Sequence, residues 1–69
     1  MSESTYKLVE LVGTSKESVT DAIETAIARA GATIRNLRWF EVIQVRGSVS
    51  EGKVDQYQVT LKVGFTLED

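Results

Sequence analysis

Apolar and polar residues alternate along two long runs in the second half of the chain, residues 37–49 and 54–67. A period of two residues is typical of a strand with one buried face. The pair Glu51-Gly52 between the two runs is a tight-turn signal. We therefore expect the two runs to form a β-hairpin.

The turn fixes the register of this hairpin, because a two-residue turn places Ser50 opposite Lys53. A shift of one residue would mix the apolar and polar faces. One face carries the apolar residues that a core needs, in the predicted pairs Phe40 with Val63, Val42 with Leu61, and Gln44 with Val59. The other face is less apolar and carries the pairs Trp39 with Gly64, Glu41 with Lys62, Ile43 with Thr60, and Val45 with Gln58.

The first half of the chain predicts one strand and one helix. Residues 6–12 indicate a strand with apolar side chains on both faces, and Gly13 is expected to end it. Thr14 to Glu17 fits the capping-box pattern that begins a helix. Behind it, apolar residues recur at helical spacing and form a single stripe: Val19, Ala22, Ile23, Ala26, Ile27 and Ala30.

Together these elements predict an α+β fold of the type β-α-β-β. If all neighbouring strands are antiparallel, the last strand must lie in the middle of the sheet, which gives the strand order 1-3-2. The last strand also has the most continuous apolar alternation, as a central strand requires. The helix is expected to cover the apolar face of the hairpin.

The chain has 69 residues, so it forms one small domain whose core gives only marginal stability. Cysteine and histidine are both absent, which excludes disulfides and removes the usual ligands of a zinc site. The usual catalytic constellation of nucleophile, histidine and acid is missing for the same reason. Oligomerisation is the support that remains for so small a domain.

The net charge of −2 and the isoelectric point near 5.0 argue against nucleic-acid binding, which normally needs a basic stripe. No apolar run approaches the roughly 20 residues of a membrane span, and no signal peptide opens the chain. We therefore expect a cytoplasmic protein with neither a nucleic-acid nor a membrane partner.

The only tryptophan, Trp39, lies on the less apolar face of the predicted hairpin. From the pattern alone it fits a ligand platform and an oligomer-interface anchor about equally, since tryptophan is enriched at interfaces. Gln58 lies on the same face and, by pattern alone, fits an ordinary solvated strand residue. The run Gly13-Thr14-Ser15 could bind an anion at the helix N-terminus, although an ordinary helix cap is the simpler interpretation.

Several short motifs, taken in order, resemble those of the dodecins, which are small flavin-binding proteins that assemble into hollow dodecamers. Each motif is weak alone, whereas the set is specific. The motifs are Val12-Gly13-Thr14-Ser15, Trp39-Phe40-Glu41-Val42, Arg46-Gly47, Tyr57-Gln58-Val59 and Val63-Gly64-Phe65. The resemblance implies that residues 1–69 form a single dodecin-like flavin-binding domain of the bacterial type.

The resemblance also implies roles for four residues. Trp39 is similar to the tryptophan that stacks on the flavin ring, and Gln58 to the glutamine that hydrogen-bonds the polar edge of that ring. Arg46 resembles an arginine near the ribityl and phosphate part of the ligand. Gln44 is neutral where some archaeal members carry an acidic residue, which favours FMN over riboflavin or lumichrome. Bacterial dodecins have also been associated with coenzyme A, which implies a second, separate site.

Two geometric expectations concern these residues. Gln58 is expected opposite Val45, six residues from Trp39, which is roughly 20 Å at about 3.3 Å per residue. One ring cannot touch both, so we expect the site to be shared between subunits of a homododecamer. Strict alternation places Arg46 on the helix-covered face, unless a bulge near Gly47 or the end of the strand redirects it. Without either, Arg46 is a surface ion-pair residue.

The function that the resemblance implies is non-catalytic: storage and buffering of FMN, with quenching of its photochemistry by the indole. A flavoenzyme would need a proton-transfer residue near the ring, and the sequence offers no candidate. The alternative is a structural self-assembling domain whose second sheet face is only an oligomer interface. Yellow protein with quenched flavin fluorescence separates the first function from the alternative.

Overall fold

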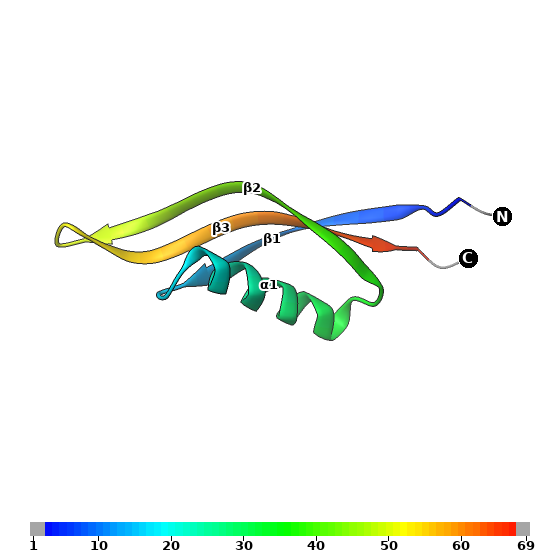
Figure 1. Ribbon diagram of the computed structural model, residues 1–69, viewed down its shortest axis with the longest axis horizontal. Helices are drawn as coiled ribbons and strands as arrows, with labels where there is room; N and C mark the ends of the chain where they lie inside the picture. Colours follow the sequence, from blue (N-terminus) through cyan, green and yellow to red (C-terminus); the bar gives the residue numbers. More distant parts are fainter. Residues whose placement is uncertain (1–2, 68–69) are drawn as a thin grey trace.

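The computed structural model describes residues 3–67 and contains one helix on a three-stranded antiparallel sheet (Figure 1). In chain order the elements are β1 (Tyr6–Ser15), α1 (Val19–Thr33), β2 (Leu37–Ser50) and β3 (Lys53–Thr66). The strand order is β1-β3-β2, and α1 lies against one face of the sheet. The predicted α+β architecture and the 1-3-2 order are confirmed.

The core lies between α1 and the central strand β3. Ala22 and Ala26 of the helix are buried against Val59, Leu61 and Val63 of the strand. The other members of the predicted helical stripe are buried or pack around this cluster. The stripe is therefore confirmed, and its alanines allow the helix axis to come close to the sheet because they carry so little side chain.

Gly13 marks a close approach between α1 and β1. A methyl group on Gly13 would lie 2.2 Å from the carbonyl oxygen of Ala22 and 2.9 Å from Cβ of Ala26. The strand continues through Gly13 to Ser15, so the prediction that this glycine ends the strand is wrong. Its role is to leave room for the backbone of the helix.

The helix begins later than the sequence predicts. Its N-cap is Ser18, whose side chain accepts a hydrogen bond of 2.9 Å from the backbone N–H of Asp21. The predicted capping box at residues 14–17 is wrong, because β1 extends to Ser15. The buried Ser15 hydroxyl instead organises the connection, since it accepts from the Glu17 N–H (2.8 Å) and donates to the Asp21 carboxylate (2.7 Å).

The turn of the hairpin is the one predicted. Glu51 and Gly52 both have positive φ, 53° and 76°, as a two-residue type I′ turn requires. Ser50 faces Lys53. Near the other end of the hairpin, the predicted register holds for Trp39 with Gly64, Phe40 with Val63, Glu41 with Lys62, and Val42 with Leu61.

Between these two stretches the register differs from the prediction. β2 contains an extra residue at Ile43, so that Gln44 faces Thr60 and Arg46 faces Gln58. A second irregularity, after Ser48, restores the predicted register before the turn. The predicted pairs Gln44 with Val59, Ile43 with Thr60, and Val45 with Gln58 are wrong, because one inserted residue moves the residues after it to the opposite face.

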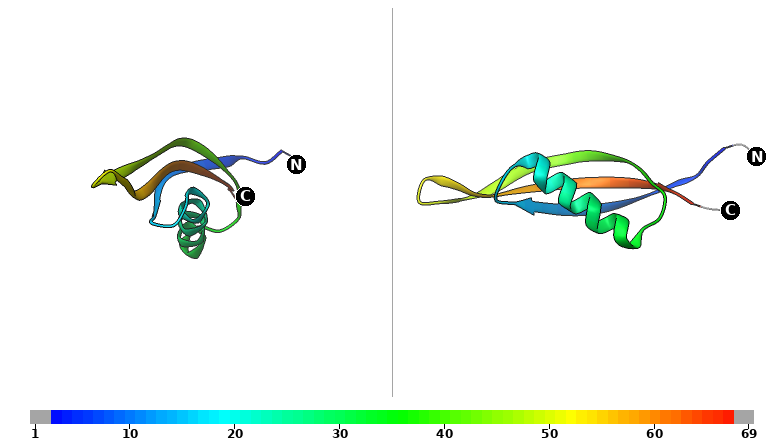
Figure 2. Two further views of the ribbon diagram at one scale, coloured as in Figure 1. Left: turned by 60° about the vertical axis from the view of Figure 1, so that its left-hand side comes forward. Right: turned by 60° about the horizontal axis from the view of Figure 1, so that its bottom comes forward.

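The helix covers only part of the sheet face on which it lies. α1 packs on β1 and β3, and the sheet curves over it while β2 extends past it (Figure 2). On the helix side of β2, Phe40, Val42 and Val45 remain 39% to 52% exposed. The expectation that the helix covers the apolar face of the hairpin is therefore right for β3 and wrong for β2.

Candidate functional site

The sheet face away from α1 carries the tryptophan selected from the sequence. Trp39 is 42% exposed and is the direct ladder partner of the buried Gly64. A methyl group on Gly64 would lie 2.5 Å from both Cε2 and Cζ2 of the indole, so the benzo ring lies directly over this glycine. An aromatic ring placed over a strand glycine supplies the packing that the missing side chain would give.

Tyr6 of β1 supports the same indole. The two ring centroids lie 4.9 Å apart, with an angle of 68° between the planes, which is a T-shaped contact. Tyr6 is not among the site residues expected from the sequence. The strand order contains the signal, because β1 and β2 flank β3 and Tyr6 alternates onto the face of Trp39. We call Tyr6, Trp39 and Gly64 the aromatic platform.

Replacing Gly64 by alanine is expected to displace the indole, because the new methyl group would overlap two of its carbon atoms. Tryptophan emission should shift and its quenching by acrylamide should rise, while the far-ultraviolet circular dichroism stays unchanged. Gly31→Ala is the matched control, since a methyl group there meets only Cδ1 of Leu37, at 3.7 Å. Unchanged emission and quenching in Gly64→Ala would contradict this seating of the indole.

Arg46 and Gln58 lie side by side on the face of Trp39. They are ladder partners, and Nε of Arg46 donates a hydrogen bond of 3.1 Å to Oε1 of Gln58. The expectation that alternation places Arg46 on the helix-covered face is wrong. The bulge that turns it round lies at Ile43, three residues before Arg46, and not near Gly47. We call Arg46 and Gln58 the polar corner.

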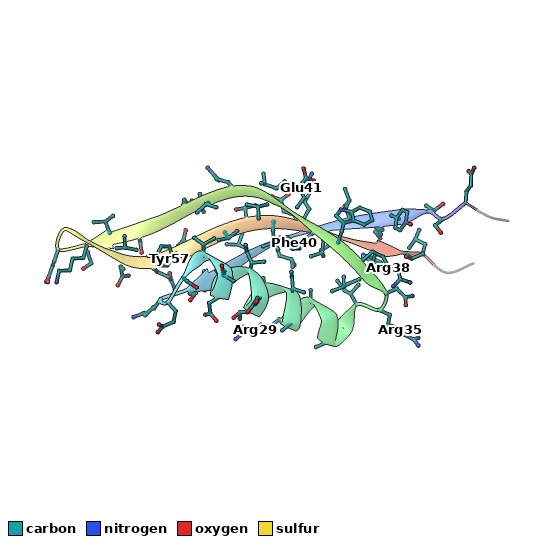
Figure 3. All side chains as sticks on the ribbon, in the orientation of Figure 1. Arg29, Arg35, Arg38, Phe40, Glu41 and Tyr57 are labelled. Carbon is teal, nitrogen blue, oxygen red and sulfur yellow. The ribbon has the colours of Figure 1, made fainter. Side chains whose placement is uncertain are left out.

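Gln44, the fourth residue selected from the sequence, lies on this face between the platform and the polar corner. It is exposed and faces Thr60 of the central strand. The ladder pair of Glu41 and Lys62 separates it from Trp39, and Glu41 points away from the helix (Figure 3). Gln44 therefore lies exposed over the middle of the sheet, on the same face as Trp39 and the polar corner.

Arg38 is a second cation near the platform that the sequence analysis did not select. Its Nε donates a hydrogen bond of 3.1 Å to Oγ1 of Thr66. The ladder shifts between Leu37 and Trp39, so Arg38 lies at an irregularity of β2. At such an irregularity, strict alternation does not predict on which face of the sheet the Arg38 side chain lies.

The polar corner and the aromatic platform of one chain are separate. Gln58 and Gly64 lie six residues apart in β3, which corresponds to roughly 20 Å at about 3.3 Å per residue. The structure thus brings Arg46 and Gln58 together, but it brings neither of them to the Trp39 of the same chain.

Two other kinds of site are absent from residues 3–67. No three or more histidine, cysteine, aspartate or glutamate side chains group together in a way that could hold a metal ion. Nor does this part of the chain contain a helix long and apolar enough to cross a membrane.

Known proteins of one family match this chain over almost its whole length. The family model described as Dodecin matches residues 5–68. A curated dodecin from Thermus thermophilus is 56% identical over 64 residues, which cover 93% of each chain. A crystal structure of a Thermus thermophilus protein superimposes with a TM-score of 0.93 at 54% identity, covering 97% of this chain and 98% of the other.

A dodecin from Streptomyces coelicolor matches with a TM-score of 0.94 at 51% identity, over 100% of this chain and 99% of the relative. Family model, sequence and fold therefore agree over almost the whole length. The chain belongs to the dodecin family.

Proposed function

We propose that this protein binds FMN without catalysing a reaction on it, and that it stores and buffers the flavin and quenches its photochemistry. The observation that carries the proposal is the exposed indole of Trp39, seated on Gly64 on the sheet face that the helix leaves free. Membership of the dodecin family supports the same conclusion.

The aromatic platform suits the flat, electron-poor ring system of a flavin. Indole is the most electron-rich aromatic side chain, and offset stacking of two aromatics contributes about 0.5–1.5 kcal/mol beyond the burial of their surfaces. Tyr6 and Gly64 restrict the directions in which the indole can turn. A stacked indole also transfers an electron to the excited flavin, which explains quenching.

The polar corner suits the remaining parts of the ligand. Gln58 can hydrogen-bond the polar pyrimidine edge of the ring. The Nε of Arg46 is used by Gln58, but both terminal amino groups of the guanidinium are left for the ribityl chain or the phosphate. Gln44 adds no negative charge beside them, so FMN is favoured over riboflavin or lumichrome.

One flavin uses the Trp39 of one subunit and the polar corner of another. The reason is the separation of roughly 20 Å between these groups within one chain, which is longer than the ring. The site is therefore completed only by assembly, and an isolated subunit does not bind.

The uncovered side of β2 supports assembly. Phe40, Val42 and Val45 are exposed there, beside a hollow of about 170 Å³ whose lining includes Ile27 and Leu37. Contiguous exposed apolar surface of this kind marks an interaction site. A second copy of the chain packs on this apolar surface of β2, in the homododecamer that is typical of the family.

A purely structural self-assembling domain is the alternative. It uses the same apolar surface, and Trp39 is then only an interface anchor. The two functions differ in one observable: the alternative predicts a colourless assembly that takes up no flavin when FMN is added.

Native mass spectrometry of protein from cells, combined with flavin fluorescence, tests the proposal. We expect a mass of twelve chains plus flavin, with emission that is quenched and returns on denaturation. We also expect that dissociation into folded subunits releases the flavin. Flavin that stays bound to folded single subunits would contradict the shared site, and an assembly without flavin would favour the structural alternative. The same spectrum tests whether coenzyme A is bound at a separate site.

A further inference from the structure

We propose that Arg38 is an anion-binding residue at the edge of the aromatic platform, where it contacts the phosphate of a flavin whose ring stacks on the Trp39 of the same chain. This role rests on the proposed flavin binding and names a residue that favours FMN over riboflavin. It adds to the site a cation that belongs neither to the sequence motifs nor to the polar corner.

The hydrogen bond between Arg38 and Thr66 fixes the position of the guanidinium. Thr66 is the ladder partner of Tyr6 and lies two residues beyond Gly64 in β3, so its side chain leaves the sheet on the face of the aromatic platform. The 3.1 Å hydrogen bond to Oγ1 of Thr66 brings Nε of Arg38 to this point. Two residues of a strand span about 7 Å, so the guanidinium lies beside the ring that Trp39 presents.

The irregularity of β2 lets Arg38 lie there. Leu37 faces Phe65, and the next residue of β3, Gly64, already faces Trp39, so Arg38 is an extra residue in this ladder. A bulge directs a side chain away from the position that strict alternation gives it, and bulges are frequent next to functional sites. Arg38 can therefore lie against β3 while Trp39, the next residue, keeps its place on the platform.

The other cations of this sheet face, within residues 3–67, have their charge offset or lie far away. Lys62 lies in the ladder between Glu10 of β1 and Glu41 of β2, so two carboxylates on the same face offset its charge. Arg46 lies in the polar corner, roughly 20 Å from the platform of its own chain. Arg38 is exposed, and its hydrogen bond uses Nε, so both terminal amino groups are left for an anion.

A guanidinium suits a phosphate because its N–H donors can form two parallel, charge-assisted hydrogen bonds with two phosphate oxygens. A phosphate monoester carries about −1.5 to −2 charge at pH 7. The five-carbon chain between the ring and the phosphate of FMN is long enough to cover the gap between Trp39 and Arg38. Riboflavin has the same ring and chain without the phosphate, so Arg38 raises the affinity for FMN only.

Arg38→Gln tests this role, because glutamine keeps a hydrogen-bond donor and removes the positive charge. We expect the dissociation constant of FMN to rise about 3- to 10-fold, as for an exposed charge-assisted pair, while that of riboflavin stays unchanged. Arg38→Lys, which keeps the charge, should retain most of the preference for FMN. Fluorescence titration with both flavins gives the ratio of the two constants, and an unchanged ratio in Arg38→Gln would overturn the proposal.

The dependence on salt gives a second readout of the same contact. Raising the ionic strength from about 0.01 M to about 1 M shortens the Debye length from about 30 Å to about 3 Å. The preference of the unaltered protein for FMN should fall over this range, and it should fall less in Arg38→Gln. Effects of salt on assembly and stacking cancel, because both flavins are measured at the same ionic strength. An equal fall in both proteins would contradict the contact.

Arg29→Gln is the matched control for the loss of one positive charge, because Arg29 is exposed on α1, on the other side of the sheet (Figure 3). It should leave the ratio unchanged, and a change as large as that in Arg38→Gln would show that only the overall charge matters. If the unaltered protein binds neither flavin, the proposed function and this role fall together. If it binds both and the ratio is the same in Arg38→Gln, the role of Arg38 alone falls.

Discussion

Replacing Trp39 by alanine is expected to lower the affinity for FMN at least about 100-fold. The substitution removes both the offset stacking and the apolar surface of a ring system that buries up to about 250 Å², at roughly 25 cal/mol per Å². Because the indole is exposed and lies outside the core, the chain should still fold. Titration of flavin fluorescence measures both the affinity and the quenching.

Trp39→Phe is the graded control for this experiment. Phenylalanine keeps a ring over Gly64 but is less electron-rich than indole, so we expect a smaller loss of affinity and weaker quenching. Sedimentation of each variant shows whether assembly is retained. FMN binding by Trp39→Ala that equals that of the unaltered protein, in an intact assembly, would rule out the platform as the flavin site.

Replacing Gly13 by alanine is expected to destabilise the fold by about 2–3 kcal/mol, as overpacked cores do. The methyl group would overlap the carbonyl oxygen of Ala22, which is backbone and cannot rotate away. In a domain of this size each kcal/mol moves the melting temperature by roughly 4–8 °C. Thermal unfolding at one fixed protein concentration measures the change, since assembly also contributes to stability.

Gly31→Ala provides the comparison for Gly13→Ala. Gly31 lies within α1 and has room for a methyl group, so alanine there should stabilise the protein by about 0.5–1 kcal/mol. Opposite shifts in melting temperature would separate steric overlap from a general effect of glycine. A melting temperature of Gly13→Ala that matches the unaltered protein would show that the helix can move aside without cost.

Much of the fold could be predicted from the sequence because its signals are periodic or local. The stripe that includes Ala22 and Ala26 has helical spacing, and the alternation in β3 runs without interruption through the core. The turn at Glu51-Gly52 depends on two adjacent residues only. The 1-3-2 order then followed from chain direction and needed no side-chain detail.

The polar corner could not be predicted in the same way, because it depends on one inserted residue. Strict alternation put the polar residues Gln44 and Arg46 on the apolar face and Val45 on the other. The bulge at Ile43 explains this mismatch between residue type and face. It shifts the alternation by one residue, so that Gln44 and Arg46 lie on the face away from the helix and Val45 lies on the helix side. From the sequence a bulge was considered only near Gly47, so the position of the shift at Ile43 required the structure.

The limits of the helix and of its contacts depend on tertiary structure in the same way. A hydroxyl followed three residues later by an acidic residue occurs both at Thr14 and at Ser18, and the length of β1 decides which one caps the helix. From the sequence alone, Gly13 is read as a residue that ends the strand. Only its contact with the neighbouring helix explains why a glycine is needed there.

The packing of the indole on Gly64 also limits how many flavin molecules one chain can bind at this position. With one side of the ring occupied by the strand beneath it, each polypeptide has a single aromatic surface left to offer. We therefore expect loading at this position to saturate at a molar ratio of one flavin per chain, whatever the number of subunits in the assembly. Any uptake beyond that ratio belongs to a different place on the molecule.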